Sequence, residues 1–207
     1  MKKLLIVGTG GLARELTNWC SEKFEVIGYF SINKDEHAKF KLPGKLFTGE
    51  LTPKATGAEC ALIAIGSPEA KKRYFSQLKE SGFTFPSFVH SSSTVSKSAE
   101  VGEGTVIAPQ CVIGPNTKLG QAIYVNFQVG IGHDAQIGDF VQINPGAQIG
   151  GLVTVGNSVL IGSGSTILEK LSVGNNAIVG SGSSCFARVP ENATVIGSPA
   201  KRMRAFE

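Results

Sequence analysis

The sequence predicts a chain of the α/β plus β-solenoid class, in which a small Rossmann-like domain precedes a parallel β-helix. From Val89 to Val179, every sixth residue is Ile, Leu or Val, sixteen positions in a row, although these residue types fill only 47 of the 207 positions. Before residue 88 this period fails, and strand-like and helix-like segments alternate instead. The first strand-like segment runs into a glycine-rich turn that opens a helix.

The α/β domain is expected to contain strands at 4–7, 26–30 and 61–65 and helices at about 12–23 and 69–81. Alternating strands and helices are typical of an open sheet that is covered by helices. Phe85-Pro86-Ser87 is the expected linker, so we place the first domain at 1–86 and the second at 87–207.

Two strand ends of this domain are candidate ligand sites. Thr9, Gly10 and Gly11 belong to a G-x-G-x-x-A turn after the first strand, where backbone amides can hold an anion. Ile65 and Gly66 follow the strand at 61–65, at the edge where open α/β sheets bind ligands. This second segment fits equally well as a tight turn with Ser67 as the helix N-cap.

The strand at 26–30 ends without the acidic residue that holds ribose hydroxyls in dinucleotide sites. Ser31 and Ile32 occupy that place. NAD is therefore not expected, and a domain of this size has room for one nucleotide rather than two.

The six-residue period predicts one flat face of a parallel β-helix, with three faces in a coil of 18 residues. Each inward aliphatic side chain is buried only when the next coil stacks on it. Small residues stand two positions before many of the aliphatic ones, where they fit crowded inner corners: Ala99, Thr105, Cys111, Thr117, Ala135, Ala147, Ser165, Ala177 and Ser183.

Composition limits the function classes. No apolar run reaches the length of a membrane span, and the first residues lead into a strand rather than a signal peptide, so a cytoplasmic protein is expected. The four scattered cysteines have no metal-ligand spacing, so we expect reduced thiols and no metal site. A net charge of +4 without interleaved aromatic and basic residues does not indicate a nucleic-acid partner.

Two basic runs are either solvated faces or phosphate contacts. They are Lys71 to Arg73 in the first domain and Lys201, Arg202 and Arg204 near the end of the chain.

The pattern of an aliphatic residue, glycine, two variable residues and a small residue resembles the hexapeptide-repeat acyltransferases, whose coils wind left-handed. Together with the front domain, the pair His133-Asp134 and the segment 196–201, the whole chain resembles one subgroup. These are the bacterial sugar acetyltransferases that include the sialic acid O-acetyltransferases and the N-acetyltransferases of nucleotide-linked 4-amino-4,6-dideoxy sugars. The resemblance implies a homotrimer that binds acetyl-CoA between neighbouring β-helices and the nucleotide-linked sugar at the front domain.

The resemblance also implies roles for particular residues. His133 matches the catalytic base and Asp134 its acidic neighbour. Thr9, Gly10, Gly11, Ile65 and Gly66 match the nucleotide-sugar contacts, while Ser163 and Ser181 match backbone contacts to the pantetheine arm of acetyl-CoA. Lys201, in the segment 196–201, is a further candidate contact to the cofactor. The chain departs from the family at Ser31 and Ile32, where uridine-binding members carry Asp, and at Gln142, where some relatives have a second histidine.

His133 is the histidine that sits within the repeat, since His37 lies in a predicted loop and His90 in the linker. A neutral imidazole can remove the proton of an attacking amine or hydroxyl, and Asp134 can fix its tautomer. One coil of 18 residues beyond His133 lies Gly151, whose N–H could stabilise an oxyanion. An exposed surface histidine and a glycine that merely turns a corner are the alternatives.

The leading hypothesis is an acetyl-CoA-dependent N-acetyltransferase that acts on the 4-amino group of a nucleotide-linked deoxysugar. An O-acetyltransferase of sialic acid or a similar sugar fits the same residues. A trimeric scaffold or sugar-nucleotide sensor, which is not an enzyme, would have no use for His133 and Asp134.

Overall fold

The computed structural model describes residues 1–31 and 33–203 and divides into two compact units. The first unit is Met1–Phe88 and the second begins at Val89. Ile32 and Arg204, which were named in the sequence analysis, lie outside the described residues.

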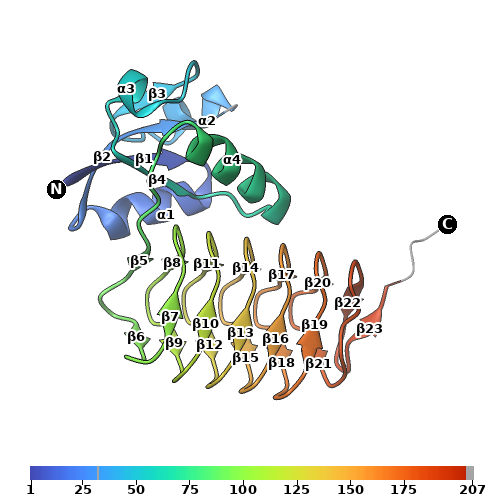
Figure 1. The fold of residues 1–207 in the computed structure, drawn as a ribbon. Coiled ribbons are helices and arrows are strands. Elements are labelled where there is room, and N and C mark those ends of the chain that lie inside the picture. Colours follow the sequence, from blue (N-terminus) through green and yellow to red (C-terminus); the bar gives the residue numbers. More distant parts are fainter. Residues whose placement is uncertain (32, 204–207) are drawn as a thin grey trace. The chain divides into compact units, whose positions relative to one another are not determined.

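The first unit contains a four-stranded parallel sheet with the strand order β3-β2-β1-β4. Its strands are β1 (Lys2–Val7), β2 (Phe24–Phe30), β3 (Lys45–Phe47) and β4 (Cys60–Ile63), and its helices are α1 (Gly11–Cys20), α2 (Lys34–Lys39), α3 (Pro53–Thr56) and α4 (Pro68–Glu80). The chain passes from β1 to β2 on one side and later returns to β4 on the other side of β1 (Figure 1). This reversal leaves a crevice at the carboxyl ends of the central strands.

Local sequence explains the two long helices. In α1, the buried residues Ala13, Leu16 and Cys20 recur with helical spacing on one face. At the start of α4, the Ser67 side chain accepts a hydrogen bond from the Ala70 N–H, and Pro68 occupies the first turn. The N-cap role predicted for Ser67 is therefore confirmed.

The stretch between β2 and β4 was poorly predicted. The sequence analysis expected a loop around His37, but His37 lies in α2, whose N-cap is the Asn33 side chain. The elements here are only three to six residues long and are too short to show a period. α3 begins with a Thr52 cap and ends at Gly57 in the left-handed region.

The second unit is a parallel β-helix in which short strands stack into three sheets (Figure 1). The six-stranded sheet holds β6 (Thr94–Val95), β9 (Val112–Ile113), β12 (Gly130–Ile131), β15 (Gln148–Ile149), β18 (Thr166–Ile167) and β21 (Ser184–Cys185); the five-stranded sheet holds β7 (Glu100–Val101), β10 (Lys118–Leu119), β13 (Gln136–Ile137), β16 (Thr154–Val155) and β19 (Ser172–Val173); the eight-stranded sheet holds β5 (Phe88–Val89), β8 (Val106–Ile107), β11 (Tyr124–Val125), β14 (Gln142–Ile143), β17 (Leu160–Ile161), β20 (Ile178–Val179), β22 (Thr194–Ile196) and β23 (Lys201–Arg202).

Stacked strands pair with partners 18 residues apart, so equivalent side chains lie directly above one another. Ile131 pairs with Ile113 on one side and with Ile149 on the other. The aliphatic positions fill one continuous core, and the small residues before them are almost all fully buried. At the C-terminal end, β23 pairs antiparallel with β22. His90, expected in the linker, belongs to the first coil, because its N–H donates to the Ile107 carbonyl.

Three columns of turns connect the sheets, and each is named here by one residue. The His133 corner leads from the six-stranded to the five-stranded sheet and comprises 114–117, 132–135 and 150–153. The Asn157 corner leads from the five-stranded to the eight-stranded sheet and comprises 120–123, 138–141 and 156–159. The Ser163 corner leads back to the six-stranded sheet and comprises 126–129, 144–147, 162–165 and 180–183.

Candidate functional site

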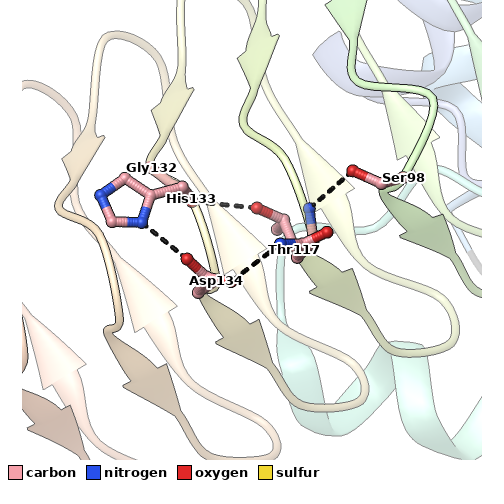
Figure 2. A network of polar contacts seen from close by, with 6 residues as sticks. Ser98, Thr117, Gly132, His133 and Asp134 are labelled. Carbon is pink, nitrogen blue, oxygen red and sulfur yellow. Dashed lines mark hydrogen bonds and ion pairs between the residues drawn. The ribbon is translucent and has the colours of Figure 1, made fainter.

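The imidazole of His133 projects from the His133 corner and pairs with the next residue along the chain. Nδ1 of His133 lies 2.8 Å from Oδ2 of Asp134, and 59% of the His133 side chain is exposed (Figure 2). Because a carboxylate only accepts hydrogen bonds, Nδ1 carries the hydrogen in this pair. The neutral ring then presents Nε2 as an acceptor. This is the tautomer that a general base requires.

Asp134 is held by the coil below it. Its Oδ1 accepts a hydrogen bond of 3.1 Å from Nδ2 of Asn116, and the Asn116 N–H donates to the Ser98 hydroxyl (Figure 2). Hydrogen bonds from His133 and then from Asn116 lower the pKa of Asp134 below its ordinary value. Asp134 has a φ of +57°, a conformation that Asp tolerates better than most residues. The carboxylate therefore stays charged and oriented toward the imidazole.

Gly151 lies directly against the His133 ring, as the 18-residue spacing predicted. A Cβ atom built on Gly151 would come within 2.7 Å of Nε2 and 2.8 Å of Cε1 of His133. Any side chain at position 151 would therefore displace the imidazole. Within residues 1–31 and 33–203, the Gly151 N–H donates to no acceptor, so it remains available for a ligand oxygen.

The expected cofactor residues lie on different parts of the β-helix. Ser163 and Ser181 stack at the Ser163 corner, where the Gly182 N–H donates to the Ser163 carbonyl, and both side chains are exposed. This corner and the His133 corner border the same six-stranded sheet. Gln142 is buried on the eight-stranded sheet, which does not border the His133 corner, and its Nε2 donates to Asn144 Oδ1. Lys201 is exposed on β23.

A pocket of about 300 Å³ opens at the carboxyl ends of β1, β2 and β4 in the first unit. Gly8 shapes its floor with a φ of +121°, and a Cβ there would come within 2.7 Å of the Ala64 carbonyl oxygen. Only glycine lets the end of β1 pass this close to the segment after β4. The pocket therefore lies at the reversal of strand order, where open α/β sheets bind ligands.

Four of the six residues predicted for the nucleotide-sugar site line this pocket. They are Thr9, Gly10, Ser31 and Ile65, whereas Gly11 and Gly66 are not part of the lining. Sequence analysis missed Phe30, Glu36, Arg73 and Tyr74, which also line it. Arg73 had been noted only as part of a basic run, and Glu36 arrives from a helix that the sequence did not predict. Phe30 and Tyr74 pack edge to face, with ring centroids 5.6 Å apart.

Remaining reactive groups are distributed as structural ones. The four cysteines are free and buried, and burial raises the pKa of the Cys20 thiol to about 12. Among the described residues, no group of three or more His, Cys, Asp or Glu side chains is arranged to hold a metal ion. In the same residues, no helix is long and apolar enough to cross a membrane.

Comparisons with known proteins place both units. Residues 3–78 match the model of the PglD N-terminal domain. The acetyltransferase domain of PglB from Neisseria gonorrhoeae FA1090 is 25% identical with a TM-score of 0.86, and the match covers 98% of this chain and 100% of that one. The chain belongs to the hexapeptide-repeat sugar acetyltransferases.

Two further structures share the fold of this acetyltransferase. PerB from Caulobacter crescentus, solved with CoA and GDP-perosamine, is 22% identical with a TM-score of 0.86, and 99% of this chain and 98% of PerB are covered. WeeI from Acinetobacter baumannii AYE is 23% identical with a TM-score of 0.83, and 98% of this chain and all of WeeI are covered. The resemblance and the fold class predicted from the sequence, a small α/β domain followed by a left-handed parallel β-helix, are confirmed.

Proposed function

We propose that this acetyltransferase moves the acetyl group of acetyl-CoA to the 4-amino group of a nucleotide-linked 4-amino-4,6-dideoxysugar, for the assembly of a surface polysaccharide or glycan. The observation that carries the proposal is the pairing of His133 with Asp134 beside Gly151, in a chain that also holds a pocket at the glycine turn. The relative in complex with acetyl-CoA, which is 25% identical over nearly the whole chain, supports the choice of donor.

The chemistry begins with the amine of the sugar, which must be neutral to attack a thioester. Nε2 of His133 accepts the proton as the amine nitrogen bonds to the acetyl carbon. Asp134 stabilises the imidazolium that forms. General-base assistance of this kind contributes roughly a hundred- to ten-thousandfold in rate.

The negative charge that develops on the acetyl oxygen needs a hydrogen-bond donor, and the Gly151 N–H is the one nearest to His133. The tetrahedral intermediate collapses when the carbon–sulfur bond breaks, and the imidazolium returns its proton to the departing sulfur. This sequence regenerates neutral His133 and releases CoA and an amide. No covalent acyl-enzyme is needed.

The cofactor is proposed to lie along the β-helix with Ser163 and Ser181 as backbone contacts, and Gln142 and Lys201 are further candidate contacts. Because Gln142 lies on a sheet that does not border the His133 corner of its own chain, it could reach that site only from a neighbouring chain. We propose a homotrimer on this basis. Light scattering that gives three times the chain mass supports it, and a monomer at assay concentration contradicts it. Because both proposed substrates belong to cytoplasmic metabolism, we place the enzyme there.

The test follows thiol release from acetyl-CoA with UDP-, dTDP- and GDP-linked 4-amino sugars and with free sialic acid. Turnover with an amino sugar, lost in His133→Ala, establishes N-acetyl transfer and names the nucleotide. Turnover with sialic acid alone assigns O-acetylation instead. Silence with every acceptor, in a protein that still binds nucleotide, contradicts an enzymatic role and favours a sensor or scaffold.

A further inference from the structure

The pocket of the first unit contains a carboxylate that sequence reasoning expected to be missing. Glu36, on α2, lines the pocket, and its Oε2 lies 2.9 Å from the hydroxyl oxygen of Thr9. Thr9 belongs to the glycine turn and is almost fully buried. The carboxylate is therefore anchored to the turn itself rather than free to swing in solvent.

Hydrogen-bond chemistry gives this contact a direction. A threonine hydroxyl has one hydrogen and a carboxylate has none, so Thr9 donates to Glu36. The Ser31 hydroxyl, 3.0 Å from the Thr9 oxygen, must then donate to Thr9, while the Asn33 N–H donates to Ser31 at 3.0 Å. This chain of donors ends on Glu36. A carboxylate offers about four acceptor sites, and Thr9 occupies one of them.

The location of Glu36 matches that of the ribose-binding acid in dinucleotide folds, although its origin differs. In those folds the acid stands at the end of the second strand, beside the glycine turn. Here that strand end is Ser31, and α2 brings a carboxylate back to the same turn five residues later. A Cβ built on Gly10 would lie 3.9 Å from Oε2 of Glu36, which is ordinary contact distance.

A group of opposite charge lines the same pocket from the other side of β1. Arg73 lies on α4, which follows β4, whereas Glu36 lies on α2, which follows β2. β2 and β4 flank β1 in the sheet. An acceptor on one side and a guanidinium on the other suit a ligand with hydroxyl donors at one end and phosphate at the other.

We propose that Glu36 binds the 2′- and 3′-hydroxyl pair of the nucleotide and makes this enzyme select ribonucleotide-linked over 2′-deoxyribonucleotide-linked sugars. The inference rests on the proposed function, because it assumes that this pocket holds the nucleotide of the donor sugar. A cis-diol offers two donors to a carboxylate, and a 2′-deoxy sugar offers one. Arg73 takes the diphosphate end.

Calorimetry with UDP, dUDP, GDP and dGDP tests the assignment in the wild type, in Glu36→Gln and in the matched control Glu22→Gln. Glu22 is exposed and lies outside the pocket. We expect the ribonucleotide to bind about tenfold more tightly than its 2′-deoxy partner, a difference of about 1.4 kcal/mol. This preference should fall below about threefold in Glu36→Gln and persist in Glu22→Gln.

An unchanged ribo-to-deoxy ratio in Glu36→Gln overturns the proposal. So does a variant that loses discrimination between GDP and UDP while keeping the ratio, since that result means that the carboxylate reads the base. Glu36→Asp, which keeps the charge but withdraws it by one methylene, should fall between the wild type and Glu36→Gln.

Acetyl-transfer assays on the same variants separate this inference from the proposed function. Glu36→Gln is expected to raise KM for the nucleotide-linked sugar with little change in kcat. If the wild type prefers ribonucleotides but transfers acetyl to no sugar, the proposed function fails and the ribose assignment stands. If acetyl transfer proceeds and KM in Glu36→Gln is unchanged, the ribose assignment alone fails.

Discussion

Two corners of the β-helix have the same turn and the same 18-residue register but dispose of their polar groups in opposite ways. At the Asn157 corner, the Asp139 N–H donates to Asn157 Oδ1 at 2.7 Å, and the Asn157 N–H donates to Asn175 Oδ1 at 2.8 Å. At the His133 corner, the corresponding N–H of Gly151 finds no acceptor in the described part of the chain, and an imidazole stands over it instead.

This difference separates a structural corner from a functional one. Side-chain oxygens from each coil satisfy the turn of the coil below at the Asn157 corner, so a ligand there would have to displace existing hydrogen bonds. The His133 corner leaves its donor open and adds a general base beside it. At the Ser163 corner too, the N–H groups of Ser163 and Ser181 donate to nothing among residues 1–31 and 33–203. The two open corners border the same sheet.

The largest expected effect comes from removing the imidazole. His133→Ala should lower kcat by roughly a hundred- to ten-thousandfold, because the base is lost, and should leave stability within about 0.5 kcal/mol, because the side chain is mostly exposed. Asn157→Ala, at the closed corner, should cost about 1 kcal/mol in the free energy of unfolding and leave kcat unchanged. Thiol release and urea denaturation measure the two quantities. Equal losses of kcat in both variants would erase the distinction between the corners.

The glycines of the two corners should divide in the same way. Gly151→Ala introduces a Cβ against exposed ring atoms of His133, so the ring moves, and we expect kcat to fall about ten- to a hundredfold with little loss of stability. Gly138→Ala places its Cβ against Asn157, including the backbone N at 2.9 Å, and should cost about 1–3 kcal/mol without a change in kcat. Full activity in Gly151→Ala would show that the ring need not rest on position 151.

Loss of charge at Asp134 should have a smaller effect. Asp134→Asn tolerates the same positive φ but removes the anion that stabilises the imidazolium, and we expect kcat to fall about tenfold. Asp139→Asn is the matched control at the closed corner, where an amide oxygen can still accept the Gln121 N–H. A loss in Asp139→Asn as large as that in Asp134→Asn would point to a general effect on the coil rather than on His133.

The smallest effect concerns pH. Hydrogen bonds from His133 and Asn116 lower the pKa of Asp134, so its carboxylate persists as pH falls through the ordinary aspartate range and is lost only below it. Asn116→Ala removes one donor, so the pKa should rise toward the ordinary value, while activity at neutral pH changes less than about twofold. A carbon-13 NMR titration of the Asp134 carboxyl measures the shift. A pKa that stays in place or falls would contradict the role given to Asn116.

The β-helix could be predicted from the sequence because its stability depends on one repeated contact. Ile131 is buried against residues exactly one coil away, so a period of six carries the fold in every segment. The region of α2, β3 and α3 has no such repetition, and its short elements depend on caps such as Asn33 and Thr52 and on their packing against the sheet. His37 was therefore misplaced in a loop.

The candidate sites were predictable to different degrees for the same reason. The 18-residue register brought Gly151 to His133 by arithmetic, and adjacency brought Asp134. The front pocket instead gathers residues from four separate segments, so Thr9 and Ile65 could be predicted from strand ends but Glu36 could not. A search for acidic residues within one short helix after the second strand, rather than at the strand end alone, would have found it.

Amide NMR of the isotope-labelled protein, with and without acetyl-CoA, tests the distinction between open and closed corners most directly. We predict that the N–H resonances of Gly151, Ser163 and Ser181 shift on addition of acetyl-CoA, while those of Asp139 and Asn157 stay in place. Shifts concentrated at Asp139 and Asn157, with Gly151 unmoved, would contradict the placement of acetyl transfer at the His133 corner.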